Sequence, residues 1–171
     1  NNFCAYCIVP YVRGRERSRS KESIIKEIER AVADGIKEFT LLGQTVNSYG
    51  KDQGDSHSFA ELLKECNEIA GVERVRYMTS HPLDMSEEVV KVVSESKNIC
   101  ENFHIPAQSG SNRILKAMNR GYTREKYLSL VDSIKKYCPE AAITTDIIVG
   151  FPGETEEDFQ DTISLMQEVQ F

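Results

Sequence analysis

Two cysteines at the start of the chain are the residues best suited to chemistry. The chain opens Asn1-Asn2-Phe3-Cys4-Ala5-Tyr6-Cys7, so Cys4 and Cys7 stand in a C-x-x-C spacing. This spacing is found in dithiol redox sites, zinc sites and iron–sulfur sites. No second C-x-x-C and no paired His motif completes a zinc site, and the pair does not follow a thioredoxin-like strand. Both of these alternatives are therefore weakened.

The other three cysteines, Cys66, Cys100 and Cys138, are scattered along the chain. A total of five is odd and suits a metal or redox site in a reducing compartment better than a disulfide framework. Because free cysteine behaves as a small apolar residue, we expect these three to be buried and inert thiols.

Composition places the chain among globular domains. Its 171 residues are 40% hydrophobic and 28% charged, enough for one sizeable core. No apolar run approaches the roughly 20 residues of a membrane span, and the start does not resemble a signal peptide. We therefore expect a cytoplasmic protein without membrane contact. The net charge of −6 argues against a nucleic-acid-binding surface that covers the whole domain, so any RNA contact must be local or made elsewhere.

The hydrophobic pattern predicts strands that alternate with helices. A first helix is expected over residues 21–33, with Ser20 as its N-cap and Gly35 just past its end. Strands are expected at 36–42, 74–79, 102–106 and 142–149, and further helices at 59–70, 87–94, 112–118, 124–137 and 155–169, the last capped by Thr155.

Strand–helix repeats with nearly continuous apolar strands imply a buried parallel sheet with right-handed crossovers, either barrel-like or doubly wound. In such folds the loops at the carboxyl ends of the strands build the site. The polar segments that begin at Gly43, Ser80, Gln108 and Gly150 are therefore expected to converge on one face.

The opening resembles the C-x-x-x-C-x-x-C motif of the radical S-adenosylmethionine (SAM) superfamily without its first cysteine, which would stand just before Asn1. Five further segments look like methylthiotransferase motifs in matching order: PYVRGRE at 10–16, LLGQTVNSY at 41–49, TSHP at 79–82, HIPAQSGS at 104–111 and GFPGE at 150–154. The resemblance covers essentially the whole chain. The version at 41–49 resembles the isopentenyladenosine branch (MiaB-type) more than the ribosomal-protein or threonylcarbamoyladenosine branches.

This resemblance implies an α/β fold, an incomplete (βα)6 partial TIM-type barrel with a parallel sheet and outer helices. Residues 1–171 would be a fragment of the radical SAM core, with the first strand and first cluster cysteine upstream and the sixth βα unit downstream. An N-terminal domain with an auxiliary cluster and a C-terminal RNA-binding domain would lie outside the chain, which would account for its acidic charge.

The implied cofactors are SAM and a 4Fe-4S cluster held by Cys4, Cys7 and the upstream cysteine, with one iron left open to SAM. A second 4Fe-4S cluster would donate sulfur from the N-terminal domain. One SAM would methylate a sulfide there, and another would yield the radical that abstracts hydrogen from the adenine C2 of isopentenyladenosine beside the tRNA anticodon. A flavodoxin or ferredoxin would supply electrons, and the fragment alone should not complete the cycle.

Four SAM contacts are implied by position on the cysteine and strand-end loops. Tyr6 would lie against the adenine, Gly43 and Gln44 would receive the methionine amino group, and Gly150 would let the backbone approach the adenine. Simple loop packing for Tyr6 and plain structural turns at Gly43 and Gly150 are the alternatives.

Three polar residues match positions that hold SAM in related enzymes. Arg120 is suited to the SAM carboxylate, Asp146 to ribose hydroxyls, and Gln108 to either. Arg120 could instead be a solvated helix-end charge, and Asp146 a buried partner of a loop amide. Because an unpaired carboxylate inside an apolar strand is costly, we favour a functional role for Asp146.

The remaining polar candidates carry no single assignment. Alternating arginines could meet tRNA phosphates or SAM, or line a solvated extended segment: Arg13, Arg15, Arg17 and Arg19. The histidines His57, His81 and His104 have no mutual ligand spacing. The last two are expected to face the site as hydrogen-bonded structural residues.

Two other functions stay open. One is a methylthiotransferase of threonylcarbamoyladenosine tRNA or of a ribosomal protein, against which the segment 41–49 speaks. The other is a non-catalytic SAM- or zinc-binding module, supported only by the incomplete cysteine motif.

Overall fold

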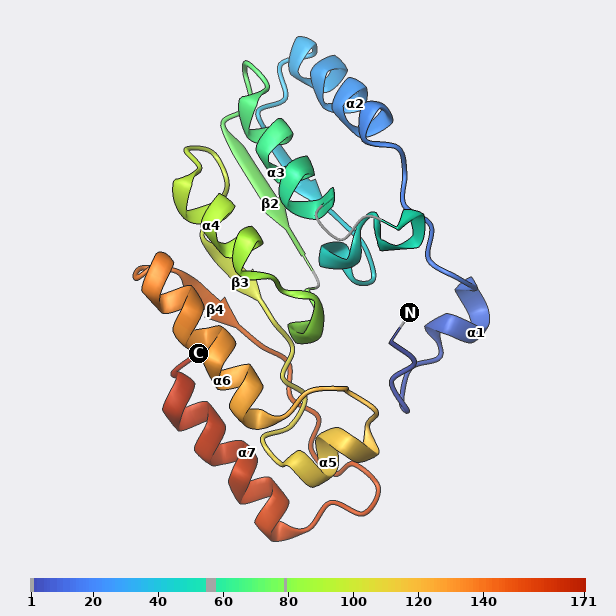
Figure 1. Ribbon diagram of the computed structural model, residues 1–171, viewed down its shortest axis with the longest axis vertical. Helices are drawn as coiled ribbons and strands as arrows, with labels where there is room; N and C mark the ends of the chain where they lie inside the picture. The colour runs from blue at the N-terminus through green and yellow to red at the C-terminus, as the bar shows by residue number, and fades with distance from the viewer. Residues whose placement is uncertain (1, 55–57, 79) are drawn as a thin grey trace.

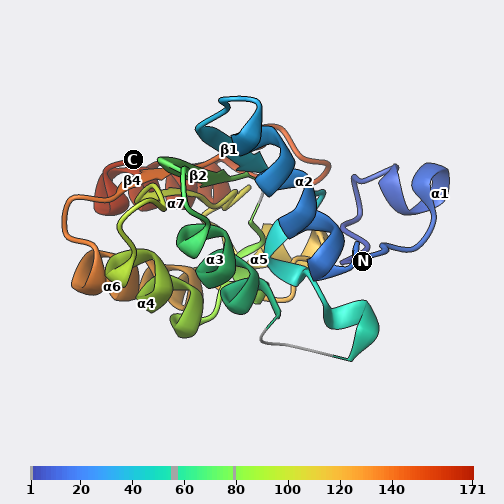
Figure 2. The ribbon, with the colours of Figure 1, turned by 90° about the horizontal axis from the view of Figure 1, so that it is seen from above.

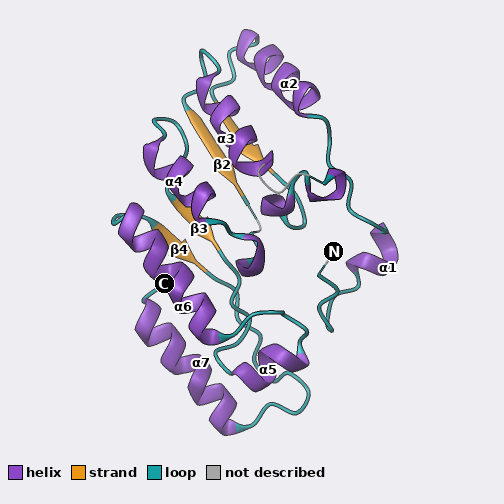
Figure 3. Cartoon of the chain, in the orientation of Figure 1, coloured by secondary structure: helices purple, strands orange, loops and turns teal. Residues whose placement is uncertain are grey.

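The computed structural model describes residues 2–54, 58–78 and 80–171, so His57 and Thr79 lie outside the described residues. The helices are α1 (Val9–Arg13), α2 (Lys21–Ala33), α3 (Ser58–Glu68), α4 (Glu87–Glu95), α5 (Asn112–Ala117), α6 (Arg124–Tyr137) and α7 (Glu156–Val169). The strands are β1 (Glu38–Leu41), β2 (Arg74–Tyr77), β3 (Asn102–His104) and β4 (Ala142–Thr144), and single 3-10 turns occur at η1 (Val46–Ser48), η2 (Lys51–Gln53) and η3 (Pro82–Asp84). Figures 1 and 3 show these elements.

The strands pair in the order in which they occur along the chain. β1 pairs with β2 and β3 with β4, all parallel. Between these pairs, the Val75 carbonyl of β2 accepts from the Cys100 amide at 2.9 Å, and the Val75 amide donates to the Asn98 carbonyl at 2.8 Å. The order β1-β2-β3-β4 without reversal is that of a barrel wall rather than of a doubly wound sheet. The predicted α/β partial barrel is therefore confirmed.

Helices α3, α4 and α6 lie on one side of the strands, as Figure 2 shows. Their apolar faces meet the buried side chains that the strands direct toward the helices. Phe59 of α3 and Phe103 of β3 both pack edge-to-face on Tyr77 of β2, with ring centroids 5.7 and 6.2 Å apart. None of the helices described is long and apolar enough to cross a membrane.

The opposite side of the sheet is exposed, and the prediction of nearly continuous buried strands is wrong. Along β2, Arg74 and Arg76 are exposed while the two residues that alternate with them are buried. Both arginines donate to the Glu38 carboxylate of β1, at 2.6 and 2.7 Å. This side faces the barrel interior, where charged side chains can remain hydrated, and helices cover only the other side.

Helix ends follow the local signals in the sequence. Ser20 caps α2 by accepting from the Ser23 amide, and Gly35 follows the helix with φ +90°. Thr155 caps α7 and forms a capping box with Asp158. Both caps were predicted. The short helix α1 was not, because its five residues are too few to show a helical hydrophobic pattern and none of them is buried.

Candidate functional site

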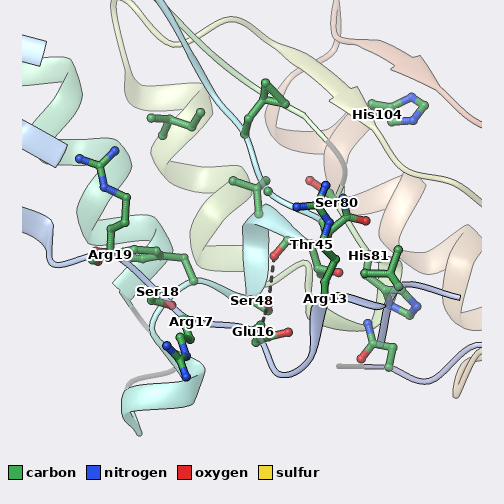
Figure 4. Close-up of a pocket in the computed structure, with 18 of the residues that line it drawn as sticks. Arg13, Glu16, Arg17, Ser18, Arg19, Thr45, Ser48, Ser80, His81 and His104 are labelled. Atoms are coloured by element: carbon green, nitrogen blue, oxygen red, sulfur yellow. Dashed lines mark hydrogen bonds between the residues drawn. The ribbon is translucent and has the colours of Figure 1, made fainter. Parts of the chain in front are cut away.

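A cleft of about 1010 Å³ lies where the cysteine loop, the Arg-rich segment and the carboxyl ends of the strands meet. Figure 4 shows part of this cleft, with Ser80, His81 and His104 at its wall. Eight predicted cofactor or metal residues line it: Cys4, Tyr6, Cys7, Gly43, Gln44, Gln108, Arg120 and Asp146. Gly150 is not among the lining residues. The expected convergence therefore holds for the segments after β1, β2 and β3, but the fourth segment turns away at its glycine.

The cysteine loop forms a tight turn at this cleft. The Cys7 amide donates to the Cys4 carbonyl at 3.0 Å, and both thiols are half-buried. Arg120 places Nη1 3.3 Å from Cys4 Sγ, which gives a thiolate there a positive partner. Among the described residues no group of three or more Cys, His, Asp or Glu side chains could hold a metal. The loop therefore fits two thiolates of a cluster, not a complete ligand set.

The other cysteines differ from this pair. Cys66 and Cys138 are buried, and burial raises the pKa of each thiol to about 11. Their predicted burial is confirmed, and buried thiols with a raised pKa are unreactive as a class. Cys100 is only half-buried, so the prediction of burial is wrong for this residue.

Arg120 is a buried cation at the centre of the site, with 5% of its surface exposed. Nε donates to the Tyr122 hydroxyl at 3.0 Å and Nη2 to the Pro106 carbonyl at 3.0 Å, while Nη1 faces Cys4 and the Tyr6 hydroxyl. The alternative of a solvated helix-end charge is therefore wrong. No carboxylate pairs with this guanidinium within the described part of the chain. A buried charge without a carboxylate partner favours an anion beside it, whether a thiolate at Cys4 or an anion in the cleft.

Tyr6 packs within the cysteine loop and is also partly exposed at the cleft. Its hydroxyl accepts from Arg120 Nη1 at 3.3 Å, which is a packing role within the loop. Burial of the hydroxyl end raises the pKa of Tyr6. Its side chain nevertheless remains 40% exposed at the cleft, where an apolar face is available to a ligand.

Gln108 adopts a left-handed backbone, with φ +67°. Its amide donates to the Asp146 carbonyl, and its carbonyl accepts from the Ile148 amide, both at 2.9 Å. A left-handed conformation costs a residue with a Cβ about 1 kcal/mol or more, and such strain clusters at functional sites. The two hydrogen bonds hold Gln108 against this strain at the cleft wall.

Asp146 is not a buried carboxylate. Its side chain is 64% exposed, because β4 ends at Thr144 and the barrel side of its extension is open. The argument that an unpaired buried charge marks Asp146 is therefore wrong. One carboxylate oxygen lies 3.5 Å from His104 Nε2, and His104 Nδ1 lies 3.0 Å from Thr144 Oγ1. His104 is thus the hydrogen-bonded wall residue that was expected.

Gly150 and Gly43, which follow β4 and β1, differ in the structural reason for having a glycine at that position. Gly150 has φ +76° and its amide donates to the Glu154 carboxylate, so this glycine serves a structural turn. Gly43 has no left-handed φ, and a Cβ there would meet Val46 Cα at 3.4 Å. It is exposed with Gln44 on the loop after β1.

His81 is buried at the cleft wall, with 6% of its surface exposed. Its backbone exchanges two hydrogen bonds of 3.0 Å with the Asn47 side chain, and Nδ1 accepts from the Leu83 amide at 3.2 Å. The predicted structural role is confirmed. Nε2 is buried without a described partner. Burial, aided by the positive charge of Arg120, lowers the pKa of His81 to about 4.

We expect this histidine to make the fold acid-sensitive. The unfolded chain protonates the ring near pH 6.5, whereas the folded chain does so only near pH 4. The neutral ring therefore costs the fold no stability above about pH 6.5, and the free energy of unfolding decreases as the pH falls from about 6.5 to about 4. Urea unfolding should show about 2 kcal/mol less stability from this group at pH 5 than at pH 7. His81→Gln, which cannot titrate, should lose that part of the pH dependence, and an unchanged pH profile would contradict the assignment.

The Arg-rich segment is an ordered strap beside the cleft. Glu16 accepts from Ser48 Oγ at 2.9 Å, and Ser18 Oγ donates to Asp52 at 2.5 Å, so these alternate side chains point toward the segment after β1 (Figure 4). Arg19 pairs with Glu27 at 2.6 Å. The others, Arg13, Arg15 and Arg17, are exposed and have no partner among the described residues.

Sequence reasoning missed Asn119. This residue follows α5 with φ +56°, and its Nδ2 donates to the Phe3 carbonyl at 3.0 Å. An Asn directly after a predicted helix is a signal for a left-handed C-terminal position. The signal locates the turn but not its partner, which lies 116 residues away along the chain.

Residues 1–166 match the radical SAM superfamily, and the chain belongs to this superfamily. Over its whole length it is 60% identical to a tRNA-2-methylthio-N(6)-dimethylallyladenosine synthase of Desulforamulus reducens and 63% identical to one of Clostridium tetani. The chain spans 38% of the length of each of these relatives. The family resemblance seen in the motifs is thereby confirmed.

A solved structure supports the fold. The radical SAM methyltransferase TsrM of Kitasatospora setae, with cobalamin and a [4Fe-4S] cluster bound, superposes on 98% of this chain and 32% of its own, with a TM-score of 0.76. The sequence identity is 18%, so this likeness concerns architecture alone.

Proposed function

We propose that this chain is the radical SAM core of a methylthiotransferase that modifies the adenine C2 of isopentenyladenosine in tRNA. The observation that carries the proposal is the meeting of the cysteine loop with Gln108, Arg120 and Asp146 in one cleft. Relatives at 60 and 63% identity bear the name of that activity.

Each residue of the cleft has a task in this proposal. Cys4 and Cys7 hold two irons of a 4Fe-4S cluster, which when bound and reduced supplies the electron that cleaves SAM. Arg120, a cation without a carboxylate partner, attracts the SAM carboxylate from behind the loop. The exposed Asp146 carboxylate accepts from ribose hydroxyls. The side-chain amide of Gln108, whose backbone is strained, contacts either the ribose or the SAM carboxylate.

Three loop residues complete the proposed SAM site. The exposed side of the Tyr6 ring packs against the adenine, and Gly43 and Gln44 receive the methionine amino group. For Gly150 we retain only an indirect role, since it holds the turn after β4 and does not line the cleft.

The proposal assigns the other partners to flanking parts of a longer protein. An auxiliary 4Fe-4S cluster would lie in an N-terminal domain, most tRNA contacts in a C-terminal one, and a flavodoxin or ferredoxin would donate electrons. The three unpartnered arginines of the strap add a local positive edge suited to phosphates. We place the protein in the cytoplasm together with its tRNA substrate.

Nucleoside analysis tests the function. The full-length protein is expressed in a bacterial strain that lacks its own methylthiotransferase, and digested tRNA is examined by mass spectrometry. We expect methylthio-isopentenyladenosine with the wild-type protein and only isopentenyladenosine with Asp146→Ala. Methylthiolation of threonylcarbamoyladenosine or of a ribosomal protein would favour the alternative substrates. A folded protein with zinc, no acid-labile sulfide and no product would favour a binding module.

A further inference from the structure

We propose that Met118, Asn119 and Arg120 form a clamp that positions the cysteine loop, with Asn119 as a positioning residue that touches no cofactor. We call these three residues the 118–120 clamp. The inference rests on the proposed function in one respect, namely that Cys4 and Cys7 hold a cluster. It adds a residue that no motif of the sequence marked.

Four consecutive loop residues each receive one contact from the clamp. The Phe3 carbonyl accepts from Asn119 Nδ2 at 3.0 Å, and the Ala5 amide donates to the Met118 carbonyl at 2.9 Å. Arg120 Nη1 reaches the Cys4 sulfur and the Tyr6 hydroxyl, both at 3.3 Å. Because the contacts involve both the backbone and the side chains of the loop, they fix its position and its orientation relative to α5.

The clamp itself is fixed by the end of α5. The Arg120 amide donates to the Leu115 carbonyl at 3.0 Å and the Met118 amide to the Ile114 carbonyl at 2.8 Å. Ile114, Leu115 and Met118 are at most 1% exposed. Asn119 takes the left-handed conformation that closes such a helix end, which turns its amide toward the loop. A buried helix thus carries the clamp as a rigid part of the core.

The cysteine loop has little packing of its own. Phe3 is 58% exposed, and the following helix α1 buries no residue. The hydrogen bond between Cys7 and Cys4 is internal to the loop and cannot place it relative to the strands. Figure 1 shows the N-terminal segment and α5 at the same end of the sheet. Without the clamp, the two thiols would keep their spacing but not their position over the cleft.

Arg120 therefore acts on two sides. It faces the cleft as a cation, and it donates a hydrogen bond to a ligand sulfur, which raises the reduction potential of iron–sulfur clusters. Asn119 acts only on the loop backbone. Its replacement separates loop position from the charge of the site.

The test compares Asn119→Gly with Gln170→Gly. Glycine keeps the left-handed backbone of Asn119 and removes the side-chain amide, which donates to the Phe3 carbonyl at 3.0 Å and more weakly to the Asn2 carbonyl at 3.5 Å. Gln170 is a matched control, since it also has a left-handed φ, +59°, at the end of a helix, and no described contact joins it to the cysteine loop. Both variants of the full-length protein are reconstituted anaerobically. Iron release to a chelator and the electron spin resonance of the reduced cluster with SAM are then measured.

We expect Asn119→Gly to release iron about 2- to 10-fold faster than wild type, which corresponds to the loss of one hydrogen bond. Its SAM-perturbed resonance should broaden, while Gln170→Gly matches wild type. Asn119→Asp serves as a second variant, because it retains size and left-handed tolerance but cannot donate to a carbonyl. Wild-type release rates and resonance in both Asn119 variants would overturn the clamp. Absence of a cluster from the wild-type protein would instead overturn the proposed function.

Discussion

Replacement of Cys4 or Cys7 by Ala in the full-length protein is expected to abolish the SAM-binding cluster and formation of the modified nucleoside. Both thiols lie on one tight turn at the cleft, and in the proposed site removal of either would leave an iron without its protein ligand. Mutation of a residue that only hydrogen-bonds a metal ligand typically lowers metal affinity or activity by about 10- to 100-fold. Loss of a ligand itself should cost more, so we expect the yield of modified nucleoside to fall by more than about 100-fold. Iron, acid-labile sulfide and spin resonance measure the cluster, and mass spectrometry of nucleosides measures the product.

Cys100→Ala is the matched control for these variants. Cys100 is half-buried like the pair, but it is absent from the lining of the cleft. It should keep a wild-type cluster signal and wild-type product. A Cys7→Ala protein that retained the SAM-responsive cluster would show that the C-x-x-C pair is not its ligand and would remove the basis of the proposed function.

Gly110→Ala is expected to destabilise the fold strongly, because the added methyl group would meet the backbone of α7. A Cβ at Gly110 would stand 2.3 Å from the Asp161 carbonyl oxygen and 2.6 Å from Thr162 Cα, both in the backbone of α7. The Gly110 amide also donates to Thr162 Oγ1 at 2.9 Å, so loop and helix cannot separate without losing this bond. Overpacking of this kind costs about 3 kcal/mol or more, which lowers the melting temperature by roughly 6–12 °C at this chain length.

Thermal melting followed by circular dichroism tests this expectation on the chain. Gly43→Ala is the control, because its nearest contact is 3.4 Å and its φ is ordinary. We expect this variant to melt close to wild type. A Gly110→Ala chain that also melted close to wild type would mean that α7 moves away easily and does not fix the strand-end loop.

Much of the secondary structure could be predicted from the sequence because its signals are local. The predicted helices at 21–33 and 124–137 coincide with α2 and α6. The caps Ser20 and Thr155 act within three residues of their partners. Strand ends were less accurate: β4 covers 142–144 within the predicted 142–149, since regular pairing with β3 ends at Thr144 and resumes only as an isolated bridge between Gln108 and Ile147.

The residues of the candidate site could be predicted from the sequence, but their arrangement in space could not. Spacing singled out Cys4 and Cys7 as a reactive pair, and the family resemblance added Arg120, whose guanidinium is suited to a carboxylate. The same reasoning misjudged Asp146, because the exposure of one side of a strand depends on what covers it.

By itself, therefore, the sequence determined the helices other than α1, the caps at Ser20 and Thr155, the family motifs and the residue types available to the site. Only the tertiary structure decided the order of the strands, the open side of the sheet, the exclusion of Gly150 from the cleft and the contact of Asn119 with Phe3. The first group depends on interactions between residues a few positions apart. The second depends on contacts between segments distant in the chain, which no local pattern encodes.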